Sequence, residues 1–228
     1  MKIMNKIFFC LLFILGGELY AKQPISKSRL DQLSGVKSTN VDDKSKWDQR
    51  YSNQNFVYGK LPSKFLAENY SYIKSGSTVL DMGMGEGRNA VFLAQKGYKV
   101  TGVDISSIAV RKANLLAKEY DVRLRTITAS FESYNMPDES VDAIICFYYV
   151  DRDLISKMIK WLRPGGVIFY EAYTTDQKKL DKKYAKEADS SFVQKQELLS
   201  LFRGMEVLKF EEPLHEKEFR SSIIVRKE

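Results

Sequence analysis

The 228-residue sequence predicts an α/β fold, with a mostly parallel seven-stranded sheet and helices on both faces. Three observations support this prediction. Short apolar segments alternate with amphipathic segments at the spacing of β-α-β units. The apolar segments are nearly continuous, as expected for strands that are buried on both faces. The last two have no long helix between them, so we expect a C-terminal hairpin that contributes one antiparallel strand.

The N-terminal part of this domain follows a polar stretch. Residues 22–46 show little hydrophobic periodicity, so we expect a flexible linker there and a single domain over residues 47–228. Aromatic residues become frequent from Trp47, which indicates an ordered cap. Pro62 suits an early helical position, so a helix is expected over about residues 63–73.

The remaining elements alternate in type, which makes the predicted sheet doubly wound and Rossmann-like. Strands are expected in the segments STVLDM (77–82), YKVTGVD (98–104), RLRTITAS (123–130), VDAIICFYYV (141–150), VIFYEAY (167–173), 206–210 and 221–226. Helices are expected over 88–95, from a Ser106 or Ser107 cap to about Tyr120, over 151–162 and over 194–202. Residues 131–140 are expected to form a loop, and the charged stretch 174–191 a helix or loop.

Three glycines at alternate positions follow the first expected strand, in the segment VLDMGMGEGRNAVFLA (79–94). Ligands of open α/β sheets bind beyond the carboxyl ends of the strands, where Asp81, Gly83, Gly85 and Gly87 stand. Glycine permits a tight turn and lets a ligand approach the backbone. The segment therefore predicts a ligand-binding turn.

A nicotinamide or flavin dinucleotide is one candidate ligand for this turn. Its fingerprint, G-x-G-x-x-G/A, fits in spacing only when counted from Gly85 through Gly87 to Ala90. That match leaves Asp81 and Gly83 unexplained, which disfavours a dinucleotide-dependent oxidoreductase.

S-adenosylmethionine is the other candidate ligand, and the pattern D-x-G-x-G-x-G from Asp81 to Gly87 includes every special residue. A carboxylate at the strand end suits the ligand's ammonium, and glycine amides at a helix N-terminus suit polar or anionic groups. The second strand ends in Asp104, whose carboxylate can accept hydrogen bonds from both ribose hydroxyls. The acid before the glycines and the acid after the second strand together favour S-adenosylmethionine.

The segment VLDMGMGEGRNAVFLAQKGYKVTGVDIS resembles the first two motifs of class I S-adenosylmethionine-dependent methyltransferases. The variant GEGRNAVFLA, with the preceding WD-x-RY-x(6)-YG segment, is similar to the branch that includes tellurite-resistance and thiopurine-type small-molecule methyltransferases. The resemblance extends from about Trp47 to the end of the chain and is weakest in residues 178–191. It implies a methyltransferase of EC class 2.1.1 with S-adenosylmethionine as cofactor.

The resemblance also implies cofactor-binding roles at matching positions. The residues expected along the methionine part are Asp81, Gly83, Met84, Gly85, Cys146 and, for the carboxylate, Arg88. Those expected along the ribose and adenine are Asp104, Ile105, Ser130 and Phe131. Many relatives have an acid near Ser130, so the hydrogen bond to the adenine amino group is in doubt. Met84 replaces a residue that is often small or Cys in relatives.

Four residues after the fourth and fifth strands are catalytic candidates, because they follow the strand ends nearest the transfer point: Tyr148, Tyr149, Asp151 and Tyr173. They can position an acceptor or take its proton. Alternatively, the tyrosines pack as a lid and Asp151 caps a helix. Trp47, Arg50, Tyr51 and Tyr58 resemble the aromatic cover of relatives.

The resemblance implies a small-molecule acceptor. Asn-Pro-Pro-Tyr, typical of enzymes that methylate nucleic-acid amino groups, is absent, and we expect no nucleic-acid partner. Methyl transfer is an in-line displacement that depends mainly on orientation. A thiol, a reduced chalcogen or a chalcogen oxyanion would need little base assistance. A single histidine, His215, excludes His-rich sites, and we expect no metal.

The first 21 residues have the pattern of a signal peptide. Two lysines precede an apolar run from Ile7 to Leu15, and a small residue, Ala21, ends the segment. The run is too short to span a membrane, so we expect cleavage, no stable membrane span, and a secreted or periplasmic protein. An uncleaved segment and a cytoplasmic protein are the alternative.

Composition adds little specificity. The chain is 44% hydrophobic and 29% charged, with a net charge of +7 that could serve nucleic acid or an anionic surface. No basic run is long or interleaved with aromatic residues, which favours solvated helix faces instead. We expect a monomer. Export conflicts with the cytosolic supply of S-adenosylmethionine, so an exported adenosyl-ligand-binding protein without catalysis stays open beside the enzyme.

Overall fold

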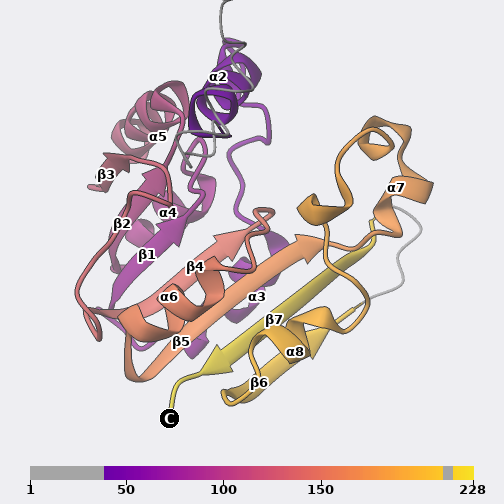
Figure 1. The fold of residues 1–228 in the computed structure, drawn as a ribbon. Coiled ribbons are helices and arrows are strands. Elements are labelled where there is room, and N and C mark those ends of the chain that lie inside the picture. The colour runs from indigo at the N-terminus through magenta and orange to yellow at the C-terminus, as the bar shows by residue number, and fades with distance from the viewer. Residues whose placement is uncertain (1–38, 213–217) are drawn as a thin grey trace, which may run out of the picture. The chain divides into compact units, whose positions relative to one another are not determined.

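The described part of the protein is built on one twisted sheet. The computed structural model describes residues 39–212 and 218–228, with side chains from residue 43 onward. In these residues seven strands follow the order β3-β2-β1-β4-β5-β7-β6 (Figure 1). The pairs among β1 to β5 are parallel, and β7 is antiparallel to both β5 and β6. The predicted α/β sheet with one antiparallel strand is confirmed.

The elements before the fourth strand agree closely with the sequence patterns. They are α2 (Thr39–Tyr51), α3 (Lys64–Asn69), a 3₁₀ turn (Tyr70–Tyr72), β1 (Thr78–Met82), α4 (Arg88–Gln95), β2 (Lys99–Asp104), α5 (Ser107–Glu119) and β3 (Arg125–Thr128). Ser106 caps α5, and its hydroxyl accepts a hydrogen bond from the Ala109 amide. Leu115 of this helix is 64% exposed.

The later elements depart further from the patterns. They are β4 (Val141–Phe147), α6 (Leu154–Trp161), β5 (Leu162–Tyr173), α7 (Gln177–Leu180), two 3₁₀ turns (Lys182–Tyr184, Asp189–Ser191), α8 (Glu197–Leu201), β6 (Glu206–Glu211) and β7 (Arg220–Arg226). Helix α6 ends one residue before its expected end at residue 162, and β5 begins with the segment LRPGG (162–166), five residues before the strand was expected. Gly165 donates a backbone hydrogen bond to Lys227, and Gly166 accepts one from it, so the C-terminal strand holds this segment extended.

Helix α2 begins at Thr39, inside the segment expected to be a linker. Contacts with the distant helix α5 account for the difference: the Asp48 carboxylate accepts hydrogen bonds from the Ser106 hydroxyl at 2.7 Å and the Ile108 amide at 3.3 Å. Helix periodicity alone gives no sign of such contacts. The predicted signal peptide, residues 22–38 and residues 213–217, which include His215, lie outside the described residues.

Apolar side chains fill both faces of the sheet. On one face, α6 and α8 contribute residues such as Met158, Trp161 and Leu198 to a buried cluster. On the other face, α3, α4 and α5 contribute Phe65, Leu93 and others. Figure 1 shows α6 in front of β4 and β5, with α3 and α4 behind the sheet. Helices therefore cover both faces, as predicted. In the part of the chain with described placement, no helix is both long and apolar enough to cross a membrane.

Candidate functional site

The carboxyl ends of β1, β2 and β4 bring the predicted cofactor residues to one edge of the sheet (Figure 1). Parallel pairing sets Asp81 beside Gly102 of β2 and Ile145 of β4, and Met82 beside Cys146. The chain leaves β1 toward β2 on one side, while β4 lies on the other. This change in strand order is where open α/β sheets bind their ligands.

The glycine turn is held by backbone groups and one carboxylate. The amides of Gly83 and Met84 both donate to the Val103 carbonyl, at 3.0 and 3.1 Å. Asp104 accepts hydrogen bonds from the Gly85 amide at 2.7 Å and the Ser106 amide at 2.8 Å. Asp104 therefore fixes the turn after β1 against the turn after β2, and each of its oxygens keeps a further lone pair for a ligand.

The three glycines of the turn all have positive φ, and each meets a different neighbour. A Cβ on Gly83 would lie 3.3 Å from Tyr149 Cβ, and one on Gly85 would lie 3.0 Å from the Tyr51 hydroxyl. A Cβ on Gly87 would lie 2.7 Å from Ala113 Cβ in helix α5. The first two glycines thus face the candidate site, whereas Gly87 allows close packing of α4 on α5.

Asp81 has the electrostatic signature expected of an ammonium-binding group. It is 2% exposed, and its Oδ2 atom has no hydrogen-bond partner among the described residues. Burial, reinforced by the negative charge of Asp104, raises its pKa to about 8, while Arg88 and the Ala90 amide oppose the rise. A buried carboxyl with one unpaired oxygen fits the ammonium of an S-adenosyl ligand.

The two charged neighbours of Asp81 act on its pKa in opposite directions. Burial raises the pKa of Asp104, and its two amide donors lower it. Arg88 is the first residue of α4 and donates to the Tyr58 carbonyl at 3.3 Å, with its guanidinium 5.6 Å from the centre of the Tyr148 ring. A carboxylate on the ligand would meet this cation at the helix N-terminus.

Met84 contributes only its backbone to the turn. Its side chain is 5% exposed and packs over Gly102, where a Cβ would lie 2.0 Å from the Met84 sulfur. The side chain thus fills the apolar cluster below β2 instead of facing the site. Sequence spacing could not give this direction, because consecutive residues of a turn do not alternate as strand residues do.

The residues expected at the adenine gather after β2 and β3. Ile105 is half-buried, and Phe131 is 8% exposed with its ring 5.0 Å from that of Tyr149. The Ser130 hydroxyl lies 3.0 Å from the Ser133 hydroxyl. Their adenine contacts stay predictions.

Cys146 is buried beneath the site. Its thiol donates to the Tyr149 carbonyl at a sulfur–oxygen distance of 3.6 Å. Burial, together with the charges of Asp81 and Asp151, raises the pKa of this thiol. The side chain therefore behaves as a small neutral group and not as a thiolate nucleophile.

Two catalytic candidates, Tyr148 and Tyr173, belong to a row of aromatic rings. The Tyr148 ring lies 4.9 Å from that of Tyr173, which lies 5.3 Å from that of Tyr184. Burial is the largest cause of the raised pKa of Tyr148 and of Tyr173. Their hydroxyls stay protonated at neutral pH, so they can donate hydrogen bonds but cannot readily take a proton.

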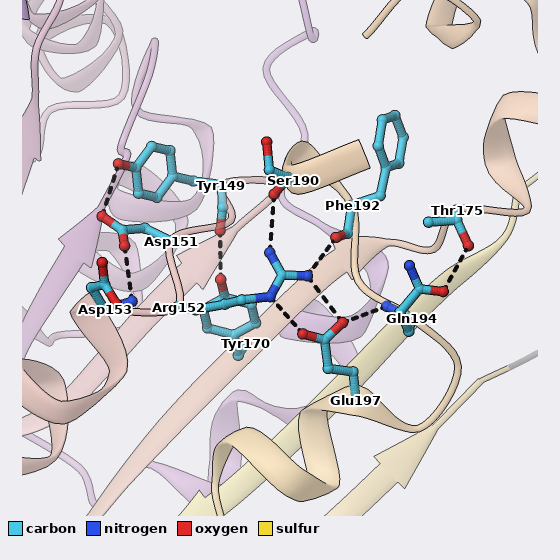
Figure 2. A network of polar contacts seen from close by, with 10 residues as sticks. All are labelled: Tyr149, Asp151, Arg152, Asp153, Tyr170, Thr175, Ser190, Phe192, Gln194 and Glu197. Atoms are coloured by element: carbon cyan, nitrogen blue, oxygen red, sulfur yellow. Dashed lines mark hydrogen bonds and ion pairs between the residues drawn. The ribbon is translucent and has the colours of Figure 1, made fainter. Parts of the chain in front are cut away.

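Tyr149 and Asp151, the other two candidates, already have structural partners (Figure 2). Asp151 Oδ1 accepts hydrogen bonds from the amides of Asp153 and Leu154, at 3.0 and 3.3 Å, and so caps the start of α6. Its Oδ2 atom accepts a hydrogen bond from the Tyr149 hydroxyl at 3.5 Å. The capping alternative for Asp151 is therefore present in the structure.

Arg152 was not expected to take part in the site, yet it joins two of its loops (Figure 2). Its guanidinium pairs with Glu197 at 2.6 Å and donates to the carbonyls of Ser190 and Phe192 at 3.1 and 2.9 Å. Glu197 also accepts a hydrogen bond from the Gln194 amide. The loop after β4 is thereby tied to the segment before α8, 38 to 45 positions further along the chain. Local sequence patterns cannot predict contacts between residues so far apart in the chain.

Glu171 was also missed, although a charged residue within the apolar strand VIFYEAY was a usable signal. It is fully buried and accepts hydrogen bonds from the hydroxyls of Ser63 at 2.9 Å and Ser222 at 2.7 Å. Arg220 lies 3.8 Å away. The Tyr148 amide donates to the Glu171 carbonyl at 2.7 Å, and Tyr148 has φ of 59°, which ends β4.

A surface depression lies at the opposite ends of the strands. Its lining includes Thr78, Lys99, Arg123 and Arg125, and none of the predicted site residues. The candidate site is therefore located by its residues and their electrostatics.

Comparison with known proteins agrees with this geometry. Residues 79–166 match a family model described as a methyltransferase domain. Phosphoethanolamine N-methyltransferase 3 of Arabidopsis thaliana is 35% identical over 103 residues, 42% of this chain and 21% of that protein. A ubiquinone biosynthesis O-methyltransferase of Pseudomonas entomophila is 31% identical over 111 residues, 46% of this chain and 47% of that protein. The matches thus span less than half the length of these curated relatives.

Solved structures share the fold at lower identity. TehB from Haemophilus influenzae superposes with a TM-score of 0.60 and 20% identity, over 81% of this chain and 67% of that one. A methyltransferase from Methanosarcina mazei gives a TM-score of 0.56 and 22% identity, over 69% of this chain and 95% of that one. Residues 79–166 therefore match a methyltransferase domain, and the fold is shared with S-adenosylmethionine-dependent methyltransferases of known structure, in agreement with the family and the cofactor expected from the motifs.

Proposed function

We propose that the protein transfers a methyl group from S-adenosylmethionine to a small-molecule acceptor. The observation that carries the proposal is the buried, unpaired Asp81 oxygen at the glycine turn, close enough to Asp104 and Arg88 for both charges to shift its pKa. When bound, the cofactor supplies a methyl group on a sulfonium, whose leaving group departs without charge. The protein's work is then to bind and align its ligands and to exclude water.

The residues divide this work between two sides. On the cofactor side, Asp81 binds the ammonium, Arg88 the carboxylate and Asp104 the ribose hydroxyls. On the acceptor side, Tyr148 and Tyr173 present flat apolar rings, while their protonated hydroxyls bond Glu171 and Tyr184. The residues of both sides lie at or after strand ends that share one edge of the sheet.

A soft acceptor, such as a thiol or a reduced chalcogen, suits this arrangement best. Both Tyr148 and Tyr173 retain their protons, and Asp151 is engaged as a helix cap. These candidates thus offer little assistance in removing a proton, and a nucleophile that reacts without it is favoured. A hydroxyl acceptor is the second candidate, because one similar protein is a ubiquinone biosynthesis O-methyltransferase.

The cofactor half of the proposal is tested by calorimetric titration of the full chain with S-adenosylmethionine, S-adenosylhomocysteine and NAD. We expect both adenosyl ligands to bind and NAD not to bind. Asp104→Ala should weaken binding of S-adenosylhomocysteine by about 100-fold, because it removes two ribose hydrogen bonds and the support of the turn. Binding of NAD alone, or an unchanged affinity in the variant, would overturn the assignment.

The acceptor half is tested with S-adenosylmethionine labelled in the methyl group. Thiophenol, selenite, tellurite and catechol are supplied separately, and labelled products are counted. Transfer to thiophenol or a chalcogen, but not to catechol, supports the soft acceptor, whereas transfer to catechol alone supports the hydroxyl acceptor. Tight binding of S-adenosylhomocysteine with no transfer to any of them favours the binding protein without catalysis.

Export by residues 1–21 and a monomeric state stay predictions of the sequence. Cell fractionation with sequencing of the mature N-terminus tests the expected cleavage after Ala21. An intact N-terminus in the cytosolic fraction would contradict export and remove the conflict with the cofactor's supply.

A further inference from the structure

A buried ion pair stands in the middle of the glycine turn. Glu86, between Gly85 and Gly87, has a side chain that is 3% exposed, and its Oε1 atom lies 2.6 Å from the Lys112 ammonium of α5. Its Oε2 atom accepts a hydrogen bond from the Val57 amide at 2.7 Å. Glu86 is thus buried against a segment that lies 29 positions earlier in the chain.

Lys112 extends the same connection. Its ammonium also donates to the Asn55 carbonyl at 2.7 Å and lies 5.4 Å from the centre of the Phe56 ring. We name the stretch between α2 and α3 the cap segment (Ser52–Pro62). Glu86 and Lys112 together contact three consecutive residues of it, 55 to 57. These contacts replace the water that both charges lose on burial.

The cap segment reaches the candidate cofactor site through the next residue. The Tyr58 carbonyl accepts a hydrogen bond from Arg88, its hydroxyl accepts one from Arg50 at 2.6 Å, and its ring lies 6.3 Å from that of Tyr51. The Tyr51 hydroxyl in turn lies over Gly85. Glu86 and Lys112 therefore join, in one set of contacts, the turn and the segment beside it.

A second ion pair between the cap segment and α5 provides a contrast. Lys60 pairs with Glu119 at 2.7 Å, but the two side chains are 38% and 50% exposed. Water screens this pair, and neither member touches the glycine turn through a described contact, so its effect on the turn should be small. The chain thus carries its own matched control.

We propose that Glu86 is a positioning residue for the S-adenosyl ligand, and that with Lys112 it holds the cap segment against the glycine turn. The inference rests on the proposed function, because it presumes that the turn binds this ligand. With the pair intact, residues 55–58 of the cap segment and the turn form the ligand site together. Without it, the ligand leaves faster and Arg88 and Tyr51 lose their alignment.

The test compares Glu86→Gln, Lys112→Met and the control Lys60→Met in the full chain, with S-adenosylhomocysteine as the probe. Calorimetry gives the Kd, and stopped-flow displacement gives the dissociation rate, both well below the Tm of every variant. We expect a Kd about tenfold higher in either test variant, carried by faster dissociation, and within about twofold of the parent in Lys60→Met. The double variant Glu86→Gln/Lys112→Met should be no weaker than the worse single variant.

The outcomes separate the two proposals. A parent chain that does not bind the probe refutes the proposed function. A parent that binds, with both test variants binding equally well, overturns the role of Glu86, even if their Tm has fallen, because a merely structural pair would lower the Tm alone. Should Glu86→Gln not fold, Lys112→Met decides by itself, since its side chain keeps the apolar length of lysine.

Discussion

The cofactor side and the acceptor side of the candidate site are held in different ways. On the cofactor side, Asp81, the glycine turn and Asp104 lie within 24 positions of one another, and backbone amides make most of the contacts. On the acceptor side, Arg152 and Glu171 bind partners 38 to 108 positions away through their side chains. A short motif thus specifies the cofactor side, whereas the acceptor side is assembled by the tertiary structure.

This contrast fits a common division of work in enzymes. The cofactor is the same whatever the acceptor, so one strand–turn–helix unit can supply its contacts. Acceptors vary, and their contacts lie on segments that a rigid sheet positions. The stretch 174–191, in which the resemblance to relatives is weakest, is the segment that Arg152 anchors at its end.

The largest expected effect tests the cofactor side directly. Asp81→Asn should weaken binding of S-adenosylhomocysteine by more than about 200-fold, because the ligand's ammonium loses its buried counter-charge. The same variant should raise the Tm of the ligand-free protein at pH 7, since burying a neutral amide avoids the cost of a desolvated acid. Calorimetry and thermal unfolding measure the two effects.

The exposed Asp138→Asn is the control for charge alone and should change neither quantity. If Asp81→Asn binds the ligand as well as the parent does, the ammonium does not meet this residue, and the comparison between the two sides loses its basis.

Gly87 and Gly97 have the same backbone conformation but different surroundings, so together they separate the effect of packing from that of positive φ. Gly87→Ala should lower the free energy of unfolding by about 3 kcal/mol, because it combines positive φ with a collision against Ala113. Gly97→Ala has the same φ of 86° but open space around it, so we expect a loss of about 1 kcal/mol. Urea unfolding measures both. Equal losses would show that helix packing contributes nothing at Gly87.

Arg152→Met probes the acceptor side. We expect a loss of about 2 kcal/mol in the free energy of unfolding and faster proteolysis within residues 174–196, because the loop after β4 no longer holds that segment. The Kd for S-adenosylhomocysteine should change less than about threefold. Lys183→Met, which removes the exposed pair with Asp181, should leave all three unchanged. A large loss of cofactor affinity in Arg152→Met would show that the two sides are not separable.

The smallest effect is a dependence of cofactor binding on pH. Because burial raises the pKa of Asp81 to about 8, this carboxyl is mostly protonated at pH 7 in the free protein, and the ligand's ammonium needs it ionised. Affinity should rise about fivefold from pH 7 to pH 8, with release of a proton on binding. Calorimetry in phosphate and Tris buffers measures that release, and equal heats in the two would contradict it.

The raised pKa of Asp81 also makes the stability of the ligand-free protein depend on pH. The pKa of Asp81 in the folded protein lies above the ordinary value of 3.8, so folding favours the protonated form. Its contribution to the stability of the ligand-free protein is therefore full below about pH 4 and is lost as the pH rises toward about 8. Bound ligand should reverse this trend.

The sequence by itself determined the α/β sheet, the bounds of α4 and the place of Asp81 and Asp104 at the strand ends. Hydrophobic periodicity and glycine spacing act over a few residues, so they can be read locally. The family and the cofactor were expected from the resemblance of the motif to known methyltransferases, which could be found because the motif lies in one unbroken segment.

Only the tertiary structure decided the partners of charged and turn residues. In the tertiary structure the Met84 side chain packs in the core and Glu86 is buried against the cap segment. Helix α2 begins as early as Thr39, and Arg152 bonds residues 190, 192 and 197. The physical reason is that a side chain's burial and ion pairing depend on what packs against it from far along the chain. Local propensity carries no record of such contacts.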